Sequence, residues 1–415
     1  MAQTVGIVGG SISGNKGAEA MVTTVIGLLR RRLPDVRFVL FSPYYKADKP
    51  LEGRFADTRV ADGSPLALVI ATFPPVLAER LLRRIGVHPA RWFAPSRLLS
   101  GCDALVDLAG ISFSDGREIY LPFNILTILP AMMLGVPVAK LAQAMGPFRR
   151  RLNRACARAL LPRCSYLVAR GESTADNLRQ IGLDCPVSPD VAFALNDVAD
   201  MAELPEELEA MLRFGDQSRA IVGVCPSSVV YSQCHKHGMD YVAVMSRVAA
   251  DLIGRGYRVL LLAHSMRPGR GGLKNNDLPV VRQVHLALGR QDQVRMIQDD
   301  LDSIALRRLI GRCEMVLASR YHAMVAALAT AVPVIVCGWG HKYRETLDVF
   351  GLGEYAVDYR SLSAEAIMQV LGRLEAGRPR ARQQIRAVLP DVIAQARRQV
   401  DDVADMLEQG RRHWR

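Results

Sequence analysis

The sequence predicts an α/β protein with two doubly wound parallel-sheet domains, and three observations lead to this fold class. Short runs rich in Val, Ile and Leu alternate with segments of helical periodicity along most of the chain. These runs are apolar throughout rather than at every second residue, which is typical of parallel strands buried on both faces. One acidic and polar stretch, residues 196–218, interrupts the alternation and predicts a linker with one short helix. We therefore expect one domain over residues 1–195 and a second over residues 219–362.

The first domain is expected to begin with a strand over Thr4–Gly10 and a helix over Gly17–Arg32, whose apolar residues recur at helical spacing. Its further strands are predicted at Val36–Pro43, Cys102–Gly110, Val136–Gln143, Ser165–Arg170 and Cys185–Asp190. The uncharged stretch Leu121–Ala139 is nominally long enough to cross a bilayer. Because it is interrupted by three prolines, we interpret it as a buried helix followed by a strand.

The second domain repeats the same alternation. Its strands are predicted at Arg219–Ser228, Tyr257–Ser265, Val294–Asp299, Glu314–Arg320 and Val332–Trp339. Residues 363–415 predict an Arg-rich helical tail that packs back across both domains. Because doubly wound sheets bind ligands beyond the carboxyl ends of their strands, we expect the functional site in a cleft between the two domains.

The formal net charge of +12 is compatible with nucleic acid, an anionic membrane surface or an acidic small substrate. Nucleic acid is disfavoured, because the chain has no zinc-finger or RNP motif and only 6% aromatic residues. The 8 cysteines form no CxxC pair, which favours a reducing compartment over a disulfide framework. The N-terminus lacks the basic start and cleavage site of a signal peptide, so a cytoplasmic location is expected.

The stretch Leu66–Trp92 is first apolar and then basic. One interpretation is a helix that rests on a membrane surface. The other is an ordinary amphipathic helix packed on the sheet, which is the more frequent case. Both interpretations stay open at this point.

A glycine-rich turn follows the first predicted strand and opens the first helix. Backbone N–H groups and the helix dipole at such a turn suit an anion, so Gly10, Gly14, Asn15 and Glu19 are candidate ligand-binding positions. The turn is not a phosphate-binding P-loop, because no Ser or Thr follows Lys16. Glycine at this position also serves tight turning alone in many α/β domains.

Other candidates lie at the carboxyl ends of later strands of the first domain, where a cleft is expected. They are Asp107, Gly110, Gln143 and Gly146.

Two charged residues close the first domain. Arg170 ends a strand and either points into the cleft or pairs with a neighbouring carboxylate. Asp190 follows Pro189 and is either a general base or part of an Asx turn.

The clearest candidate site follows the strand Met315–Ala318, where a helix begins at once. Arg320 offers two parallel donors to a carboxylate or phosphate, and His322 can supply a proton near neutral pH. Lys342 stands at the next strand-to-helix turn. We predict that these three basic groups converge on one pocket, although His322 alone also suits a helix N-cap.

The sequence gives little support for metal or serine-hydrolase chemistry. Cys234, His235 and His237 lie close together, but no second Cys/His pair completes a tetrahedral site. A Gly-x-Ser-x-Gly elbow is absent. We expect neither a metal nor a bound cofactor.

Several short motifs occur in a specific order and spacing: G-N-K-G-A-E-A, D-L-A-G-I-S-F-S-D, A-Q-A-M-G-P, V-A-R-G-E-S, S-P-D-V-A-F, S-R-Y-H-A, P-V-I-V and H-K-Y. In these motifs the chain resembles the polysaccharide pyruvyl transferase family from the first strand to about Leu352. The resemblance implies the two-domain GT-B fold. It also implies transfer of pyruvate from phosphoenolpyruvate onto a sugar, where it forms a ketal.

Carried over by position, Arg320 and His322 match the Arg-x-His motif of the family. Arg170 matches its strand-end arginine and Lys342 its late lysine. The chain departs from the family at Ala18, where an acidic residue is common, and at Ala109, where glycine is common. These departures concern the acceptor side more than the phosphoenolpyruvate side.

The resemblance implies a role for each candidate residue. Arg320, Arg170 and Lys342 would clamp the carboxylate and phosphate of phosphoenolpyruvate. His322 would donate the proton or stabilise the departing phosphate, and Asp190 or Asp107 would accept a proton from the sugar hydroxyl.

The expected partners are a sugar or lipid-linked oligosaccharide and the inner face of an anionic membrane. The basic residues between Arg80 and Arg97, together with the tail from Arg373, would meet that membrane. Two rival functions remain: a nucleotide-sugar glycosyltransferase of the same fold, and a non-catalytic module that binds glycan or membrane.

Overall fold

The computed structural model describes residues 2–84, 94–267, 275–289, 291–338 and 341–410. The chain forms two compact units. Unit 1 comprises Met1–Ser13, Met21–Val191 and Gln395–Arg415, and unit 2 comprises Gly14–Ala20 and Ala192–Ala394. The glycine-rich segment Gly14–Ala20 is therefore grouped with unit 2, although our sequence-based boundary placed it in the first domain.

Unit 1 is built on a seven-stranded sheet of order β3-β2-β1-β4-β5-β6-β7, and every strand pair is parallel. This is the doubly wound order, in which the chain works outward from β1 first to one side and then to the other. The strands are β1 (Thr4–Val8), β2 (Arg37–Ser42), β3 (Thr58–Asp62), β4 (Ala104–Asp107), β5 (Val138–Gln143), β6 (Tyr166–Arg170) and β7 (Val187–Ser188). The parallel sheet predicted from continuous apolar runs is confirmed, because all residues of β4 and β5 are buried.

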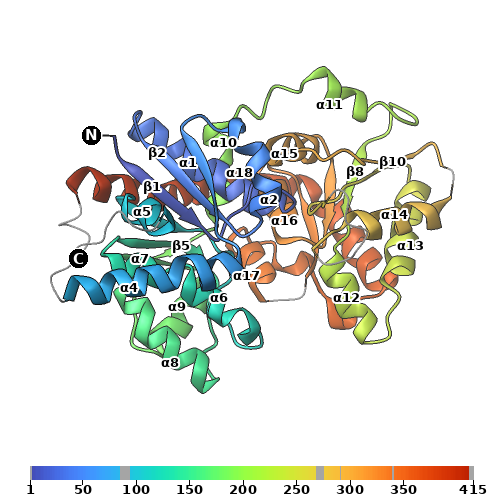
Figure 1. The fold of residues 1–415 in the computed structure, drawn as a ribbon. Helices are drawn as coiled ribbons and strands as arrows, with labels where there is room; N and C mark the ends of the chain where they lie inside the picture. The colour runs from blue at the N-terminus through green and yellow to red at the C-terminus, as the bar shows by residue number, and fades with distance from the viewer. Residues whose placement is uncertain (1, 85–93, 268–274, 290, 339–340, 411–415) are drawn as a thin grey trace. The chain divides into compact units, whose positions relative to one another are not determined.

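The helices of unit 1 connect these strands (Figure 1). They are α1 (Lys16–Arg32), which begins in the segment grouped with unit 2, α2 (Tyr45–Asp48), α3 (Pro65–Ala67), α4 (Phe73–Arg84), α5 (Ala94–Ser100), α6 (Leu121–Leu126), α7 (Leu129–Leu134), α8 (Arg151–Leu160) and α9 (Glu172–Arg179). Short helical turns of unit 1 lie at η1 (Lys49–Arg54), η2 (Leu68–Thr72), η3 (Glu118–Tyr120) and η4 (Leu161–Arg163), and η5 (Val191–Ala194) begins with the last residue of this part of unit 1 and continues into unit 2. The uncharged stretch Leu121–Ala139 forms α6, α7 and the start of β5, so helical structure followed by a strand is confirmed.

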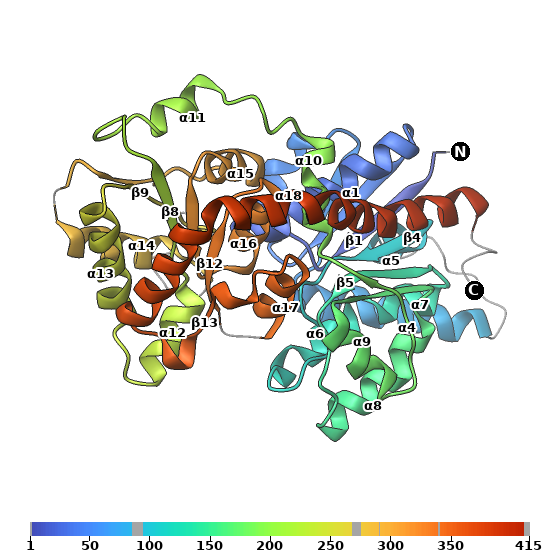
Figure 2. The ribbon, with the colours of Figure 1, turned by 180° about the vertical axis from the view of Figure 1, so that it is seen from behind.

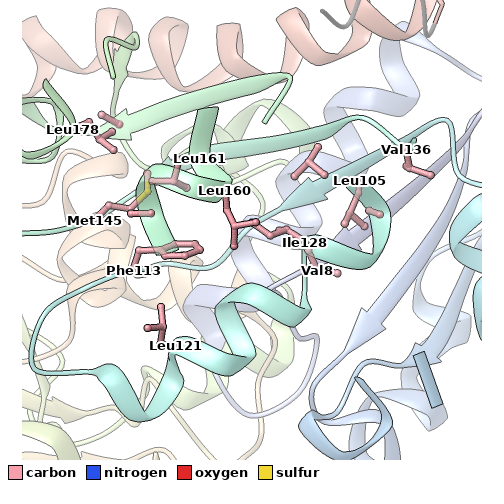
Figure 3. Packing of buried hydrophobic residues seen from close by; sticks show 14 of the residues in the cluster. Val8, Leu105, Phe113, Leu121, Ile128, Val136, Met145, Leu160, Leu161 and Leu178 are labelled. Atoms are coloured by element: carbon pink, nitrogen blue, oxygen red, sulfur yellow. The ribbon is translucent and has the colours of Figure 1, made fainter. Parts of the chain in front are cut away.

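One hydrophobic cluster fills the space between the sheet of unit 1 and helices α6 to α9 (Figure 3). Val8 and Leu105 come from the strands, Leu160 and Leu178 from helices and Ile128 from the turn between α6 and α7, and each is nearly or fully buried. Burying such aliphatic side chains stabilises a fold by about 1.5–3 kcal/mol each relative to exposure. The cluster thus holds in place the strands of unit 1 whose carboxyl ends carry the candidate residues of that unit.

Unit 2 has a six-stranded sheet of order β10-β9-β8-β11-β12-β13, again parallel in every pair. Its strands are β8 (Ile221–Cys225), β9 (Arg258–Leu261), β10 (Val294–Met296), β11 (Met315–Ala318), β12 (Val334–Gly338) and β13 (Ala356–Asp358). Its helices are α10 (Leu195–Val198), α11 (Glu206–Met211), α12 (Ser228–Lys236), α13 (Tyr241–Gly254), α14 (Leu278–Leu288), α15 (Ser303–Gly311), α16 (Tyr321–Ala329) and α17 (His341–Val349), with η6 (Gly353–Tyr355) and η7 (Tyr359–Ser361).

The predicted helical tail is one long helix, α18 (Ala364–Gln409), of 46 residues. Its residues up to Ala394 belong to unit 2 and those from Gln395 belong to unit 1. Within unit 1 the tail is fixed to the sheet, because Tyr166 in β6 donates to Asp402 at 2.6 Å and Gln399 donates to Ser188 at 3.0 Å. Figure 2 shows this last part of α18, in red, beside the strands of the seven-stranded sheet.

Candidate functional site

The strand order of unit 2 reverses between β8 and β11, so their carboxyl ends form the position where doubly wound sheets bind ligands. A buried tyrosine connects the two strand ends. The Tyr241 hydroxyl donates to Ser319 Oγ at 2.7 Å and accepts the Ser227 N–H at 3.2 Å. This edge of the sheet is therefore held in a fixed arrangement.

Arg320 stands at the N-cap of α16 in an extended conformation, at the edge of the sheet where the sequence predicted it. Its guanidinium is bound by Asp277, a fully buried carboxylate just before α14. Arg320 Nε donates to Asp277 Oδ2 at 2.9 Å, and Nη2 donates to Oδ1 at 2.6 Å. Burial acts to lower the pKa of Arg320, but the charge and hydrogen bonds of Asp277 outweigh it, so the pKa is raised.

Asp277 also accepts the Ser228 backbone N–H at 2.8 Å, and Ser228 Oγ accepts from Arg320 Nη2 at 3.1 Å. Sequence reasoning missed both residues. Ser228 could have been found, because it opens a helix directly after a strand. Asp277 precedes a Leu-Pro helix start and so resembles an ordinary N-cap, while its partner lies 43 residues away.

His322 lies in the first turn of α16, and its ring packs against Gly17 at the start of α1. A Cβ placed on Gly17 would stand 2.1 Å from His322 Nδ1, far closer than any real contact. The ring of Tyr321 meets His322 edge-on, with ring centroids 5.2 Å apart. The imidazole is thus confined between a glycine backbone and an aromatic ring.

Another histidine of unit 2, His264, lies just after β9 and is buried. Burial lowers its pKa well below 6.5, and the nearby charges of His322 and Arg320 act in the same direction. His264 is therefore neutral, and its carbonyl accepts the Lys16 N–H at 3.2 Å. Sequence reasoning missed this residue, although the rule applied to the other strand ends also identifies it.

Lys342 lies in the first turn of α17, with Nζ 5.0 Å from the ring centroid of Tyr321 and 5.5 Å from that of Tyr343. Burial raises the pKa of Tyr343 to about 12, against the lowering effect of the Arg320 charge. Arg320, His322 and Lys342 are thus all neighbours of the Tyr321–Tyr343 pair, whose ring centroids are 5.7 Å apart. The structure brings these three predicted basic residues together.

The glycine-rich turn at the start of α1 already satisfies its own backbone. Asn15 Oδ1 accepts the Gly17 N–H at 3.1 Å, as an N-cap side chain does, and Gly14 adopts a φ of +72°. Lys16 forms ion pairs with Glu19 at 3.5 Å and Asp300 at 2.6 Å. An anion at this helix end would have to displace Asn15 from the N–H groups.

In unit 1, the structure joins Arg170 to Asp190. Arg170 Nη1 donates to Asp190 Oδ2 at 2.8 Å, and Nη2 donates to the Gly110 carbonyl at 2.8 Å. Asp190 is fully buried and the side chain of Arg170 is 5% exposed. Of the two interpretations of Arg170 left open above, the carboxylate pair is the one that the structure contains.

Asp107 and Gln143 belong to a second buried network at the same edge of the seven-stranded sheet. Asp107 forms an ion pair with Lys140 of β5, and both side chains are almost completely buried. Gln143 Nε2 donates to the Asp107 carbonyl at 2.8 Å, and Gln143 Oε1 accepts from Ser112 at 2.6 Å. These contacts give both predicted residues a structural role in joining β4 to β5.

Two predicted glycines of unit 1 are required by close packing. A Cβ on Gly10 would lie 2.4 Å from Val22. Gly146 has a φ of +82°, and a Cβ there would lie 2.7 Å from Asn177. Both therefore fix the shape of a loop at the carboxyl edge.

The sequence model of the polysaccharide pyruvyl transferase family matches residues 15–341. The chain belongs to this family. The matched range includes every candidate residue of unit 2 described above except Gly14 and Lys342, as well as Arg170 and Asp190. The recognition made from the motifs is thereby confirmed.

Solved structures similar to this pyruvyl transferase family member are enzymes of the GT-B fold. The UDP-GlcNAc 2-epimerase from Neisseria meningitidis, bound to UDP-GlcNAc, superposes with a TM-score of 0.60 at 11% identity, covering 96% of this chain and 99% of the epimerase. A UGT transferase from Siraitia grosvenorii in complex with UDP gives 0.53 at 13% identity, covering 97% of this chain and 99% of that one. At these identities the likeness concerns the fold, and the predicted GT-B class is confirmed.

Gly17→Ala tests the confinement of His322 in this pyruvyl transferase family member. The added methyl group overlaps the imidazole, so the ring must turn away or α1 must shift, and we expect roughly a hundredfold loss of transferase activity. Histidine ring resonances in an NMR spectrum should report the displacement directly. Gly372→Ala in α18 is the matched control, because a Cβ there has no neighbour within 4 Å. Equal activity in the two variants would contradict the packing of the His322 ring against Gly17.

Proposed function

We propose that this chain transfers pyruvate from phosphoenolpyruvate to a sugar and forms a ketal across two sugar hydroxyls, with release of phosphate. The observation that carries this proposal is the grouping of Arg320, His322 and Lys342 at the carboxyl edge of the six-stranded sheet. A donor with a carboxylate and a phosphate needs several cationic groups, and one of them must also handle a proton.

Arg320 and Lys342 have different proposed tasks in binding the donor. The charge of Arg320 is largely balanced by Asp277, so Arg320 supplies directed N–H donors more than net charge. Lys342 Nζ lies 5.0 Å from the ring centroid of Tyr321 and 5.5 Å from that of Tyr343, and its proposed task is to bind the phosphate of the donor. Arg170 is the third proposed ligand of the donor.

The proposed reaction begins with proton transfer from His322 to the methylene carbon of phosphoenolpyruvate. The neighbouring carbon becomes electron-deficient, and the oxygen of the first sugar hydroxyl bonds to it while its proton passes to a carboxylate. The C–O bond to phosphate then breaks, and the second hydroxyl bonds to the same carbon while its proton returns to the His322 imidazole, which gave up a proton in the first step. The products are the ketal and inorganic phosphate. Fixed charges and positioning contribute most of the rate increase.

Asp190 is our candidate for the carboxylate that accepts the hydroxyl proton. Asp107 is less suitable, because it is paired with a lysine whose side chain has no exposed surface. Asp190 is paired with Arg170, which retains slight exposure at the edge of the sheet. Proton transfer to Asp190 would require this pair to loosen when the acceptor binds.

The proposal includes a cytoplasmic location and no metal or cofactor besides the donor. All eight cysteines lie in the described residues and none forms a disulfide, which is typical of proteins in a reducing compartment. The described ranges contain no group of three or more His, Cys, Asp or Glu side chains placed to hold a metal ion.

The test is incubation of the purified protein with phosphoenolpyruvate and a panel of sugars, polysaccharides and lipid-linked glycans. We expect phosphate release that depends on the acceptor, and a glycan carrying an added carboxyethylidene group in its mass spectrum. Transfer of a sugar from a nucleotide sugar under the same conditions, without use of phosphoenolpyruvate, would contradict the proposal and favour the glycosyltransferase alternative. Binding of glycans without any turnover would favour a non-catalytic module.

A further inference from the structure

We propose that the outer face of the helical segment Pro65–Arg84 in unit 1 docks on an anionic lipid bilayer. Five large apolar side chains on this segment are exposed: Leu66 by 69%, Val69 by 53%, Ile70 by 63%, Leu77 by 39% and Leu81 by 53%. We call them the outer stripe. The pyruvyl transfer proposed above does not require a membrane, so this inference goes beyond it and is tested independently of it.

The outer stripe occupies one side of a continuous helical segment formed by α3, η2 and α4. Val69 and Ile70 follow Leu66 by three and four residues, and Leu81 follows Leu77 by four. Between Ile70 and Leu77, which are seven residues apart, lies the exposed Pro74. Such spacing aligns side chains along one helix face. Soluble monomers rarely expose a contiguous apolar face of this length without a partner.

The opposite face of the segment is part of the domain core. Leu68 is 5% exposed, Val76 is fully buried and Glu79 is 1% exposed. Helix α4 packs on α7, and η2 contacts α5 and α6. This side of the segment is therefore held within unit 1.

The packing of the inner face argues for a helix that lies along a bilayer and does not cross it. Pro65–Leu82 is long and apolar enough to span, and 22% of it is buried. Spanning would remove Val76 from the core and place the Glu79 carboxylate in hydrocarbon, which costs several kcal/mol. It would also require the domain to open. Lying flat leaves the core intact and immerses the outer stripe alone.

The charge next to the outer stripe indicates which surface it meets. Residues 63–102 contain five arginines, Arg80, Arg83, Arg84, Arg91 and Arg97, and a single acidic residue, the buried Glu79. Arg80 and Arg97 are exposed in the structure. An apolar stripe followed by arginines matches a bilayer whose headgroups are negative. A second copy of the chain would bring a second set of arginines to the same interface, which disfavours self-association.

The test is co-sedimentation of the full chain with vesicles of phosphatidylcholine alone and of phosphatidylcholine mixed with phosphatidylglycerol. We expect the chain to bind the mixed vesicles and to lose this binding at high salt. The double variant Leu66→Gln/Ile70→Gln should weaken binding by roughly tenfold or more, because it removes two immersed side chains. Leu286→Gln is the matched control, since Leu286 is 76% exposed on α14 of unit 2.

Failure of the chain to bind mixed vesicles would overturn the proposal. Equal binding of the double variant and the Leu286→Gln control would overturn the role of the outer stripe. Equal binding to neutral and anionic vesicles would overturn the role of the arginines. Association of the chain with itself, abolished by Leu66→Gln/Ile70→Gln without any vesicle binding, would assign the stripe to a protein interface instead. None of these results depends on whether the chain turns over phosphoenolpyruvate.

Discussion

Replacing His322 by Gln is expected to lower the rate of acceptor-dependent phosphate release from phosphoenolpyruvate by roughly a hundredfold or more. Protonation of the methylene carbon starts the proposed reaction, and glutamine cannot supply that proton. Glutamine keeps a planar polar group beside Gly17 and Tyr321, so the local packing should be largely retained. His322→Ala should be equally inactive, but it also removes the ring from the confined space.

The control for this prediction is His235→Gln, because His235 is exposed on α12 of the same unit. Circular dichroism and thermal unfolding should show both variants folded, and only His322→Gln should lose activity. A folded His322→Gln protein with near-wild-type turnover would remove His322 from the mechanism. Retained phosphoenolpyruvate binding alongside lost turnover would locate the defect in the proton step rather than in donor binding.

The strands that carry the site could be predicted from the sequence because each is an uninterrupted apolar run. Met315–Ala318 is identified in this way, and the residues just beyond it then fall at the carboxyl edge of a parallel sheet. Arg320 and His322 were found by this reasoning alone. The two strands that the sequence did not reveal, β3 and β13, are sheet edges: β3 has two exposed residues, and β13 has three residues in all.

The partners of the candidate residues could not be predicted, because they are distant in sequence. Asp277 reaches Arg320 across 43 residues, and Gly17 meets His322 from the other end of the chain. Local patterns carry no signal for such contacts, which arise when the strands assemble. The same holds for Arg170, whose ambiguity in the sequence is resolved by a 2.8 Å ion pair with Asp190.

These ion pairs change how strongly the arginines of the candidate site are expected to attract an anionic donor. The sequence suggests several free cations aimed at a trianionic donor, whereas Arg320 and Arg170 are each joined to a buried carboxylate. A paired arginine still offers oriented donors but attracts an anion less strongly from a distance. In the proposed site, Arg320 and Arg170 therefore act through the orientation of their N–H donors more than through their net charge.

Removing the Asp277 carboxylate is expected to destabilise unit 2 more than any surface substitution. Asp277→Ala leaves the Arg320 guanidinium, whose side chain is 17% exposed, without its charge partner, and breaking a buried pair in this way costs about 3–5 kcal/mol. The Ser228 N–H also loses its acceptor. The free energy of unfolding in urea measures this loss. Arg320→Lys keeps the charge but not the two-pronged geometry, so it should cost less stability while still impairing activity.

A double variant distinguishes the pair from simple loss of packing. Asp277→Ala/Arg320→Met removes both charges together, so no uncompensated charge stays buried, and it should be more stable than Asp277→Ala alone. Activity should nevertheless be lost in the double variant, because the donors of Arg320 are gone. If Asp277→Ala costs less than about 1 kcal/mol, or if the double variant is no more stable than the single one, the ion pair does not hold this edge of the sheet together. The same measurements then separate two functions of one arginine: its pairing with Asp277 supports the fold, and its remaining donors serve the proposed phosphoenolpyruvate site.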